Sequence, residues 1–281
     1  MVQLTSGSRL TGGLVVSTVL ALVAVHRRTL TPAGGAAAIA TGTHLVAGAG
    51  ARAGLSMITF FLTSSALSRV GRASKVSFLA MWEKSDTRDA TQVFANGGVA
   101  TVCAMIYGHT RSPYALRGCC AAISTAAADT WATEVGSVCG HAPRIITTGR
   151  VAEAGTSGAV SWQGVCAALA GAAITSSLFW LRRDNGVLDA VLCATSGVAG
   201  SVIDSVLGAT IQARYRCQSC DKPTERKVHT CGATTTLTGG YRWCTNDVVN
   251  LLSTGAGSLI AASLGSWRYG VVGKPSRVAP Q

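Results

Sequence analysis

The feature that most constrains the fold is a series of long apolar stretches, each about as long as a membrane-spanning helix. A helical span needs roughly 20 mainly apolar residues. About eight stretches qualify, at 10–25, 33–50, 53–70, 93–109, 115–138, 158–181, 187–210 and 246–266. A soluble protein with buried helices would explain any single stretch. Eight in series within 281 residues favour a membrane-embedded bundle.

The composition indicates the same class of protein. Only 13% of the residues are charged and the mean hydropathy is +0.36, which is too apolar for an ordinary soluble domain. We therefore predict an all-α, polytopic transmembrane helix bundle with about eight spans. The chain is expected to form a single integral membrane domain over 1–281, with 211–245 as a long polar loop that contains cysteines.

The positive charge predicts an orientation for this bundle. The net charge of +12 lies almost wholly between the spans, and the first, third, fifth and seventh loops hold most of the Lys and Arg. Positive loops face the cytoplasm, so both termini are expected outside or in a lumen. The basic balance fits contact with anionic lipid or phosphate, and the absence of a basic-aromatic patch argues against nucleic acid. The compartment is left open.

Glycine is abundant, with 33 residues, and many glycines lie inside the predicted spans. Small residues let membrane helices approach one another closely. We predict such packing positions at Gly34, Gly35, Gly42, Gly48, Gly50, Gly197, Gly200 and Gly208.

Three of the predicted spans carry a stripe of polar residues at helical spacing, and each stripe includes a carboxylate. One stripe is Gly197, Ser201, Asp204, Ser205, Gly208 and Gln212. The others are Thr125, Asp129, Thr133 and Gly136, and Asp247, Asn250, Thr254 and Gly257. Residues three or four apart share one helix face. The interior of a helix bundle can hold all three polar faces away from the lipid, so we predict a shared internal site.

Carboxylates inside a membrane are costly unless they are solvated, paired or bound to a cation. We predict that no basic residue of these spans pairs with them, which leaves a hard divalent cation as the counter-charge. Mg²⁺ takes carboxylate and amide oxygens and often substrate phosphates. The predicted ligands are Asp129, Glu134, Asp204 and Asp247. The alternative is a hydrogen-bond network that only joins the helices.

Two glycine-containing turns are candidate phosphate sites. Arg88, Asn96, Gly97 and Gly98 lie in RDATQVFANGG, where glycine at a helix start would let backbone amides approach an anion. Thr156 and Ser157 lie in a second such turn, GTSG. The alternative is that these turns only reverse the chain. Neither matches the P-loop pattern, and no dinucleotide-binding fingerprint is present.

The 211–245 segment also contains a possible metal site. Cys217 and Cys220 have the two-residue spacing of half a zinc ribbon, and His229 and Cys231 follow. These four residues are candidate ligands for a structural Zn²⁺. Free thiols in a reducing compartment are the default interpretation.

Five motifs, taken in order, resemble the transmembrane protein 19 family, which includes the plant and cyanobacterial phytyl-phosphate kinases. They are RDATQVFANGG, ADTWATEVG, GTSGAVS, GSVIDSVLGATIQ and NDVVN, and the resemblance runs from about Ala33 to Ser263. It implies a multi-pass membrane protein and, by extension, conversion of phytyl phosphate to phytyl diphosphate with a nucleoside triphosphate donor. The cysteine-rich 211–245 segment departs from the family pattern.

From these observations we form the hypothesis of a Mg²⁺-dependent prenyl- or phytyl-phosphate kinase. Its expected partners are the bilayer, the prenyl phosphate and a nucleotide. Nucleic acid is not expected as a partner. The predicted catalytic residues are Asp204, Asp129 and Arg88. The predicted phosphate-binding residues are Arg88, Asn96, Gly97, Gly98, Thr156, Ser157 and Asn250. One alternative is an ion-coupled transporter, because intramembrane carboxylates also mark ion pathways. The other is a structural membrane protein without catalysis.

Overall fold

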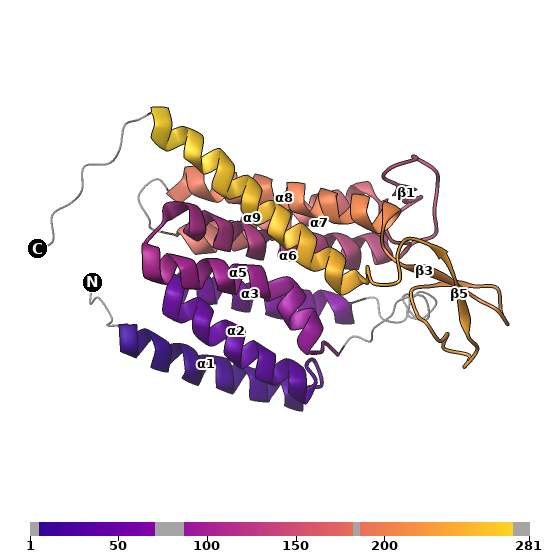
Figure 1. The fold of residues 1–281 in the computed structure, drawn as a ribbon, viewed down its shortest axis with the longest axis horizontal. Helices are drawn as coiled ribbons and strands as arrows, with labels where there is room; N and C mark the ends of the chain where they lie inside the picture. The colour runs from indigo at the N-terminus through magenta and orange to yellow at the C-terminus, as the bar shows by residue number, and fades with distance from the viewer. Residues whose placement is uncertain (1–5, 71–86, 182–185, 272–281) are drawn as a thin grey trace, which may run out of the picture.

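The protein is a bundle of long helices with two small β-sheets at one end (Figure 1). The computed structural model describes residues 6–70, 87–181 and 186–271. The described helices are α1 (Ser6–His26), α2 (Pro32–Ala49), α3 (Ala51–Arg69), α5 (Ala90–Thr110), α6 (Pro113–Cys139), α7 (Trp162–Trp180), α8 (Gly186–Thr210) and α9 (Asn246–Val271). Each coincides with a predicted span, so the all-α fold class is confirmed.

Four of these helices are both long and apolar enough to cross a bilayer by themselves. They are α1 over Gly7–His26, α7, α8, and α9 over Asn246–Leu264. The other four helices have 18 to 27 residues but are less apolar, because Gly, Ala, Ser and Thr make up much of them. They lie alongside the first four in the same bundle (Figure 1), so the number of spans lies between four and eight.

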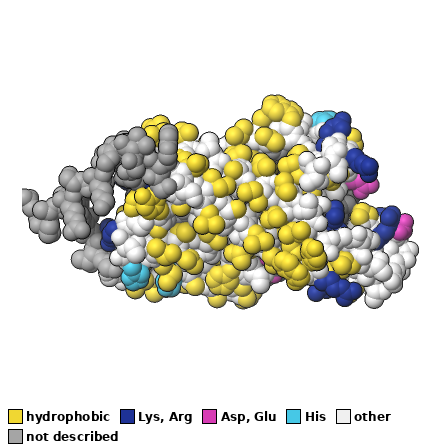
Figure 2. Space-filling view, turned by 45° about the horizontal axis from the view of Figure 1, so that its top comes forward, with side chains coloured by type: hydrophobic (Ala, Val, Ile, Leu, Met, Phe, Trp, Pro, Cys, Tyr) yellow, Lys and Arg dark blue, Asp and Glu magenta, His cyan; other side chains and the backbone are white. Residues whose placement is uncertain are grey.

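Large apolar side chains cover much of the outer surface of the helices. Leu14, Leu22, Leu259 and Leu264 are all about half exposed or more. Figure 2 shows apolar side chains spread over the visible face between the two ends of the molecule. An exposed apolar surface of this extent is suited to lipid and not to water. The chain is therefore an integral membrane protein.

Helix α6 is the centre of the bundle. Every residue from Leu116 to Ala128 is buried, and the helix packs against α3, α5, α7, α8 and α9. This is possible because its central residues are small, and small residues allow helix axes to approach closely. A Cβ placed on Gly197 or Gly200 of α8 would lie within 2.7 Å of an α6 side chain.

The predicted glycine packing is seen at most of the positions. A Cβ on Gly48 of α2 would lie 2.1 Å from the backbone oxygen of Ala104 in α5, so no side chain fits there. Gly50 is different. It has φ +90° with open space around it, and it connects α2 to α3 in a backbone conformation that favours glycine. The packing prediction is therefore wrong for Gly50.

The 211–245 segment is not only a loop, which corrects the sequence prediction. It contains the strands β3 (Arg214–Cys217), β4 (Pro223–Thr224) and β5 (Thr235–Gly239), which form an antiparallel sheet of order β4-β3-β5. A second pair, β1 (Arg144–Ile145) and β2 (Ala159–Val160), precedes α7. Figure 2 shows Lys and Arg side chains gathered at the end of the molecule that carries β3 and β5.

Candidate functional site

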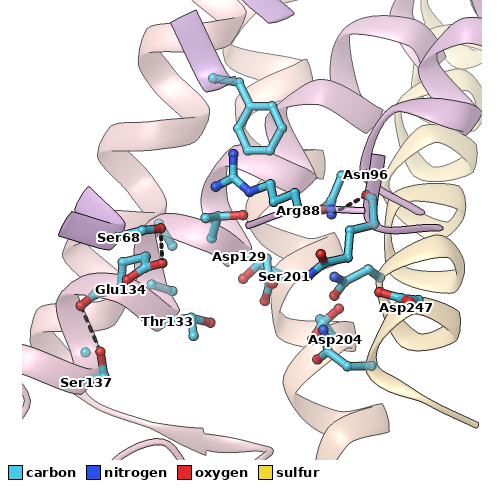
Figure 3. Close-up of a pocket in the computed structure, with 18 of the residues that line it drawn as sticks. Ser68, Arg88, Asn96, Asp129, Thr133, Glu134, Ser137, Ser201, Asp204 and Asp247 are labelled. Atoms are coloured by element: carbon cyan, nitrogen blue, oxygen red, sulfur yellow. Dashed lines mark hydrogen bonds between the residues drawn. The ribbon is translucent and has the colours of Figure 1, made fainter. Parts of the chain in front are cut away.

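A cavity of about 410 Å³ lies within the end of the bundle that carries the sheets. All eight described helices contribute residues to its lining, among them α6, α8 and α9, which carry the predicted stripes. The four predicted metal carboxylates, Asp129, Glu134, Asp204 and Asp247, all line this cavity (Figure 3).

The three predicted stripes meet at this cavity, but only with their halves nearest the sheets. The stripe residues that line it are Ser201, Asp204, Ser205 and Gly208 of α8, Gln212 just after α8, Asp129, Thr133 and Gly136 of α6, and Asp247 and Asn250 of α9. The remaining stripe residues join helices. Thr125 lies against Gly200 and Gly257, and Thr254 donates a hydrogen bond to the Ala95 carbonyl oxygen at 3.3 Å. Each stripe therefore serves an internal site at one end and helix packing at the other.

Asp129 and Asp204 are neighbours on facing helices. Asp129 of α6 lies beside both Ser201 and Asp204 of α8. Asp204 is only 9% exposed, and its Oδ2 has no hydrogen-bond partner among the described residues. Two like charges about 4 Å apart repel by roughly 4 kcal/mol at an effective dielectric constant of about 20. The pair therefore needs a proton or a cation between its carboxyl groups.

Glu134 and Asp247 have closer polar partners. Ser68 of α3 donates a hydrogen bond to the Glu134 carboxylate, and Figure 3 shows these two residues side by side, away from Asp204. Thr91 of α5 donates to Oδ2 of Asp247 at 3.0 Å. The four predicted ligands thus share one cavity, with Asp129 and Asp204 forming its most closely associated acidic pair.

Arg88 is the one Lys or Arg among the described residues that line the cavity. It lies just before α5 and extends toward α3, where its Nη1 donates to Ser65 at 3.3 Å. Its guanidinium carbon lies 5.6 Å from the centre of the Phe61 ring. These contacts hold a positive charge on the wall of a cavity that is otherwise rich in carboxylates.

The start of α5 corrects the predicted role of Gly97 and Gly98. Asp89 caps the helix, accepting a hydrogen bond from the Gln92 backbone while the Gln92 side chain accepts one from the Asp89 backbone. The helix therefore begins at Ala90. Only the first four N–H groups of a helix lack an intrahelical partner, so the amides of Gly97 and Gly98 lie too far along the helix. Gly97 lines the cavity, and Gly98 does not.

The GTSG turn lines the cavity but is not a helix start. Helix α7 begins at Trp162, where the Ser161 side chain accepts a hydrogen bond from the Gly164 backbone. Thr156 and Ser157 precede this cap and are separated from it by β2. The prediction that their backbone amides open a helix is therefore wrong, although both side chains reach the predicted site.

Sequence reasoning missed Glu225, which comes to the cavity from the 211–245 segment. Its carboxylate accepts hydrogen bonds from Ser157 and, at 2.8 Å, from Nε2 of Gln212. Gln212 also donates to the Ser157 hydroxyl oxygen at 3.2 Å. The network joins the residue that follows the end of α8, the GTSG turn and the β3–β5 sheet. The pairing of short strands brings Glu225 here, and no periodicity in the sequence indicates it.

The side of the cavity formed by α1 and α3 is largely apolar. Leu20 and Ala21 of α1, together with Met57, Ile58 and Phe61 of α3, form part of this wall. The carboxylates in the lining come from other helices, α6, α8 and α9. A single cavity therefore presents an apolar surface and a charged surface to one ligand.

The four predicted zinc ligands also come together, outside the helices. Cys217, Cys220, His229 and Cys231 place their ligand atoms within 4.8 Å of one another. Cys244, in the same segment, is buried and is not part of this group.

Comparisons with known proteins point to one family. The family profile described as "Integral membrane protein DUF92" matches residues 15–258. The chain is 31% identical to Protein PGR of Arabidopsis thaliana, over 78% of this chain and 87% of PGR. It is 29% identical to the uncharacterized membrane protein sll0875 of Synechocystis, over 88% of each. Protein VTE6, chloroplastic, of Arabidopsis thaliana is 24% identical, over 83% of this chain and 64% of VTE6. No solved structure matches significantly.

Proposed function

The chain belongs to the DUF92 family of integral membrane proteins, and within that family we propose that it is a Mg²⁺-dependent kinase. Its substrate would be a polyprenyl or phytyl monophosphate, its donor a nucleoside triphosphate, and its product the diphosphate. The proposal includes membership of the transmembrane protein 19 group, which the five sequence motifs resemble.

One observation carries this proposal. All five motifs, which are spread from Arg88 to Asn250 along the chain, contribute residues to the same cavity. The part of the cavity wall formed by α1 and α3 is largely apolar. A prenyl phosphate has an apolar chain and an anionic head, so both of its parts find a matching surface there. A ligand without an apolar chain would leave the α1 and α3 wall unused.

The carboxylates fit a magnesium ion. Asp204 has a buried oxygen without a hydrogen-bond partner in the described chain, and Asn250 has a second one, Oδ1. Carboxylate and amide oxygens are the protein ligands that Mg²⁺ prefers. Asp129 and Asp204 would hold the ion, with Asn250, Asp247 and Glu134 as further ligands. When bound, Mg²⁺ would neutralise part of the charge on the phosphate groups.

In the proposed reaction, an oxygen of the monophosphate attacks the γ-phosphorus of the donor. A new P–O bond forms, the bond between the γ-phosphorus and the bridging oxygen breaks, and the nucleoside diphosphate leaves. Phosphoryl transfer depends mainly on positioning and on charge stabilisation. Arg88 would attract phosphate oxygens, while Asn96 and Thr156 would orient them. The Ser157 hydroxyl donates a hydrogen bond to the Glu225 carboxylate, so its role would be to hold the GTSG turn in place at the cavity wall.

The test is diphosphate formation by the full-length protein in reconstituted membranes. Phytyl, geranylgeranyl and farnesyl monophosphates would each be supplied with CTP or ATP and Mg²⁺. We expect product from the wild type and also from the control variant Glu153→Gln. Glu153 is an exposed carboxylate at the same end of the molecule. A folded Asp204→Asn protein should give none.

Failure of the wild type on every prenyl phosphate would contradict the proposal. Ion-coupled flux without nucleotide would then be measured, because flux is what the transporter alternative predicts. A folded protein that shows neither activity would favour a structural role.

A further inference from the structure

The 211–245 segment holds a group of three thiols and one imidazole that the proposed kinase chemistry does not use. Cys217 ends β3, and Cys220 lies in the turn that leads to β4. His229 and Cys231 lie in the turn before β5, where Gly232 has φ +84°. Two turns of one small sheet therefore each supply a closely spaced pair of side chains.

The distances within this group match those between ligands of one metal ion. The Sγ atoms of Cys217 and Cys231 lie 3.5 Å apart, and those of Cys220 and Cys231 lie 3.7 Å apart. Nδ1 of His229 lies 3.2 Å from the Cys220 sulfur and 3.0 Å from the Cys231 sulfur. A tetrahedral zinc with Zn–S bonds of about 2.3 Å places its sulfur ligands roughly 3.8 Å apart.

A disulfide explains the group less well. The sulfur atoms are well beyond the bonding distance of about 2.05 Å, and all ten cysteines are free thiols. A bond between any two sulfurs would also leave a third thiol and His229 gathered at the same point without a reason. Three sulfurs and one imidazole nitrogen form a donor set typical of structural zinc sites.

The small sheet also lacks a core that would hold it together. Besides Cys217, the buried apolar residues described between 211 and 245 are Ala213, Tyr215 and Cys244. The three strands have only four, two and five residues. Units of this size commonly depend on a metal or a disulfide for their stability.

We propose that Cys217, Cys220, His229 and Cys231 bind one Zn²⁺ ion, which holds the β3–β5 sheet in shape at the end of the cavity. Glu225 lies between the two ligand pairs in the sequence and directly after β4. The metal therefore closes the loop that carries Glu225 to Ser157 and Gln212. The zinc site is separate from the carboxylates and does not depend on the proposed kinase activity.

Metal analysis of the full-length protein, purified in detergent with reduced thiols, tests the proposal. One zinc ion per chain is expected in the wild type. Cys220→Ser and Cys231→Ser should each weaken zinc affinity by more than about 100-fold, because losing even a hydrogen-bond partner of a ligand costs about 10–100-fold. Cys139→Ser, an exposed thiol at the end of α6, is the matched control and should keep its zinc. His229→Cys should also keep it, because four thiolates bind zinc well.

A second measurement covers the case in which the serine variants fail to fold. The wild-type protein would be treated with a chelator and then given Zn²⁺ or Co²⁺, with limited proteolysis of the 211–245 segment as the readout. Cleavage should rise on chelation and fall on re-addition, and Co²⁺ should give the absorption of a tetrahedral thiolate complex. Three results would overturn the proposal. One is wild-type protein without bound metal, and another is an equal zinc content in the wild type and Cys220→Ser. The third is a Cys217–Cys231 disulfide in protein whose thiols were blocked at lysis.

Discussion

Arg117 and Asp189 form an ion pair buried between α6 and α8, with 2.9 Å between Nε of the arginine and Oδ1 of the aspartate. The pair lies near the starts of both helices, at the end of the bundle away from the cavity. Asp204, fifteen residues farther along α8, faces Asp129 instead. One helix therefore carries one carboxylate that stabilises the fold through a basic partner and another that faces a like group.

Replacing Asp189 by Asn should destabilise the protein, because it leaves the Arg117 charge buried without its counter-charge. Removing one partner of a buried ion pair costs about 3–5 kcal/mol. Replacing Asp204 by Asn should leave stability unchanged or raise it, because it removes one of two adjacent carboxylates. Thermal unfolding in detergent without Mg²⁺ would measure both. Equal losses of stability in the two variants would contradict this assignment.

Replacing Asp129 by Asn should raise the Mg²⁺ concentration needed for half-maximal kinase activity by at least about tenfold. The reason is that Asp129 and Asp204 are the closest acidic pair in the cavity. Glu134→Gln is the matched comparison and should cause a smaller shift, because Ser68 already donates to that carboxylate. A Mg²⁺ titration of each variant would check this. A larger shift for Glu134→Gln would move the metal toward Glu134.

Replacing Arg88 by Lys should raise the KM for the prenyl monophosphate about tenfold, which corresponds to about 1.4 kcal/mol. Lysine lacks the planar guanidinium that lies over Phe61 and that can bind two phosphate oxygens at once. Arg150→Lys, an exposed position at the same end, should leave the KM unchanged. Initial rates over a range of monophosphate concentrations would show the difference, and an unchanged KM for Arg88→Lys would exclude this residue from phosphate binding.

Replacing Gly48 by Ala should destabilise the contact between α2 and α5 by about 1–3 kcal/mol or more, because the new methyl group would meet the Ala104 carbonyl. Gly98→Ala has open space around its Cβ and should stabilise α5 by up to about 1 kcal/mol. Unfolding temperatures of both variants would be compared with the wild type. An activity loss in a stable Gly98→Ala protein would restore the predicted phosphate role of that residue.

The helices could be predicted from the sequence because a lipid-facing helix requires a long apolar run, and such a run is a local property. The stripes were also local, since residues three or four apart share a face. The boundaries of α5 and α7 were less predictable. They depend on the side-chain caps at Asp89 and Ser161, which lengthen one helix and shorten the other relative to the hydrophobic pattern.

The remaining features depend on contacts between distant parts of the chain. Glu225 reaches Ser157 through the register of short strands, and Arg117 meets Asp189 because α6 packs on α8. Periodicity shows which face of a helix is polar but does not show which helix lies opposite. The cysteine spacing was more informative, because the four side chains that it groups do lie close together, with their ligand atoms within 4.8 Å of one another.

The position of the cavity near one end of the bundle has a consequence for the bilayer, which consists of two leaflets. The proposed prenyl phosphate would enter such a cavity with its charged head at the end that carries the sheets and its apolar tail toward the midplane. Only the monolayer at that end can supply it directly. Under the proposed function, substrate molecules in the opposite monolayer would first have to be flipped, so the lipid asymmetry of the membrane would limit how much substrate the protein encounters.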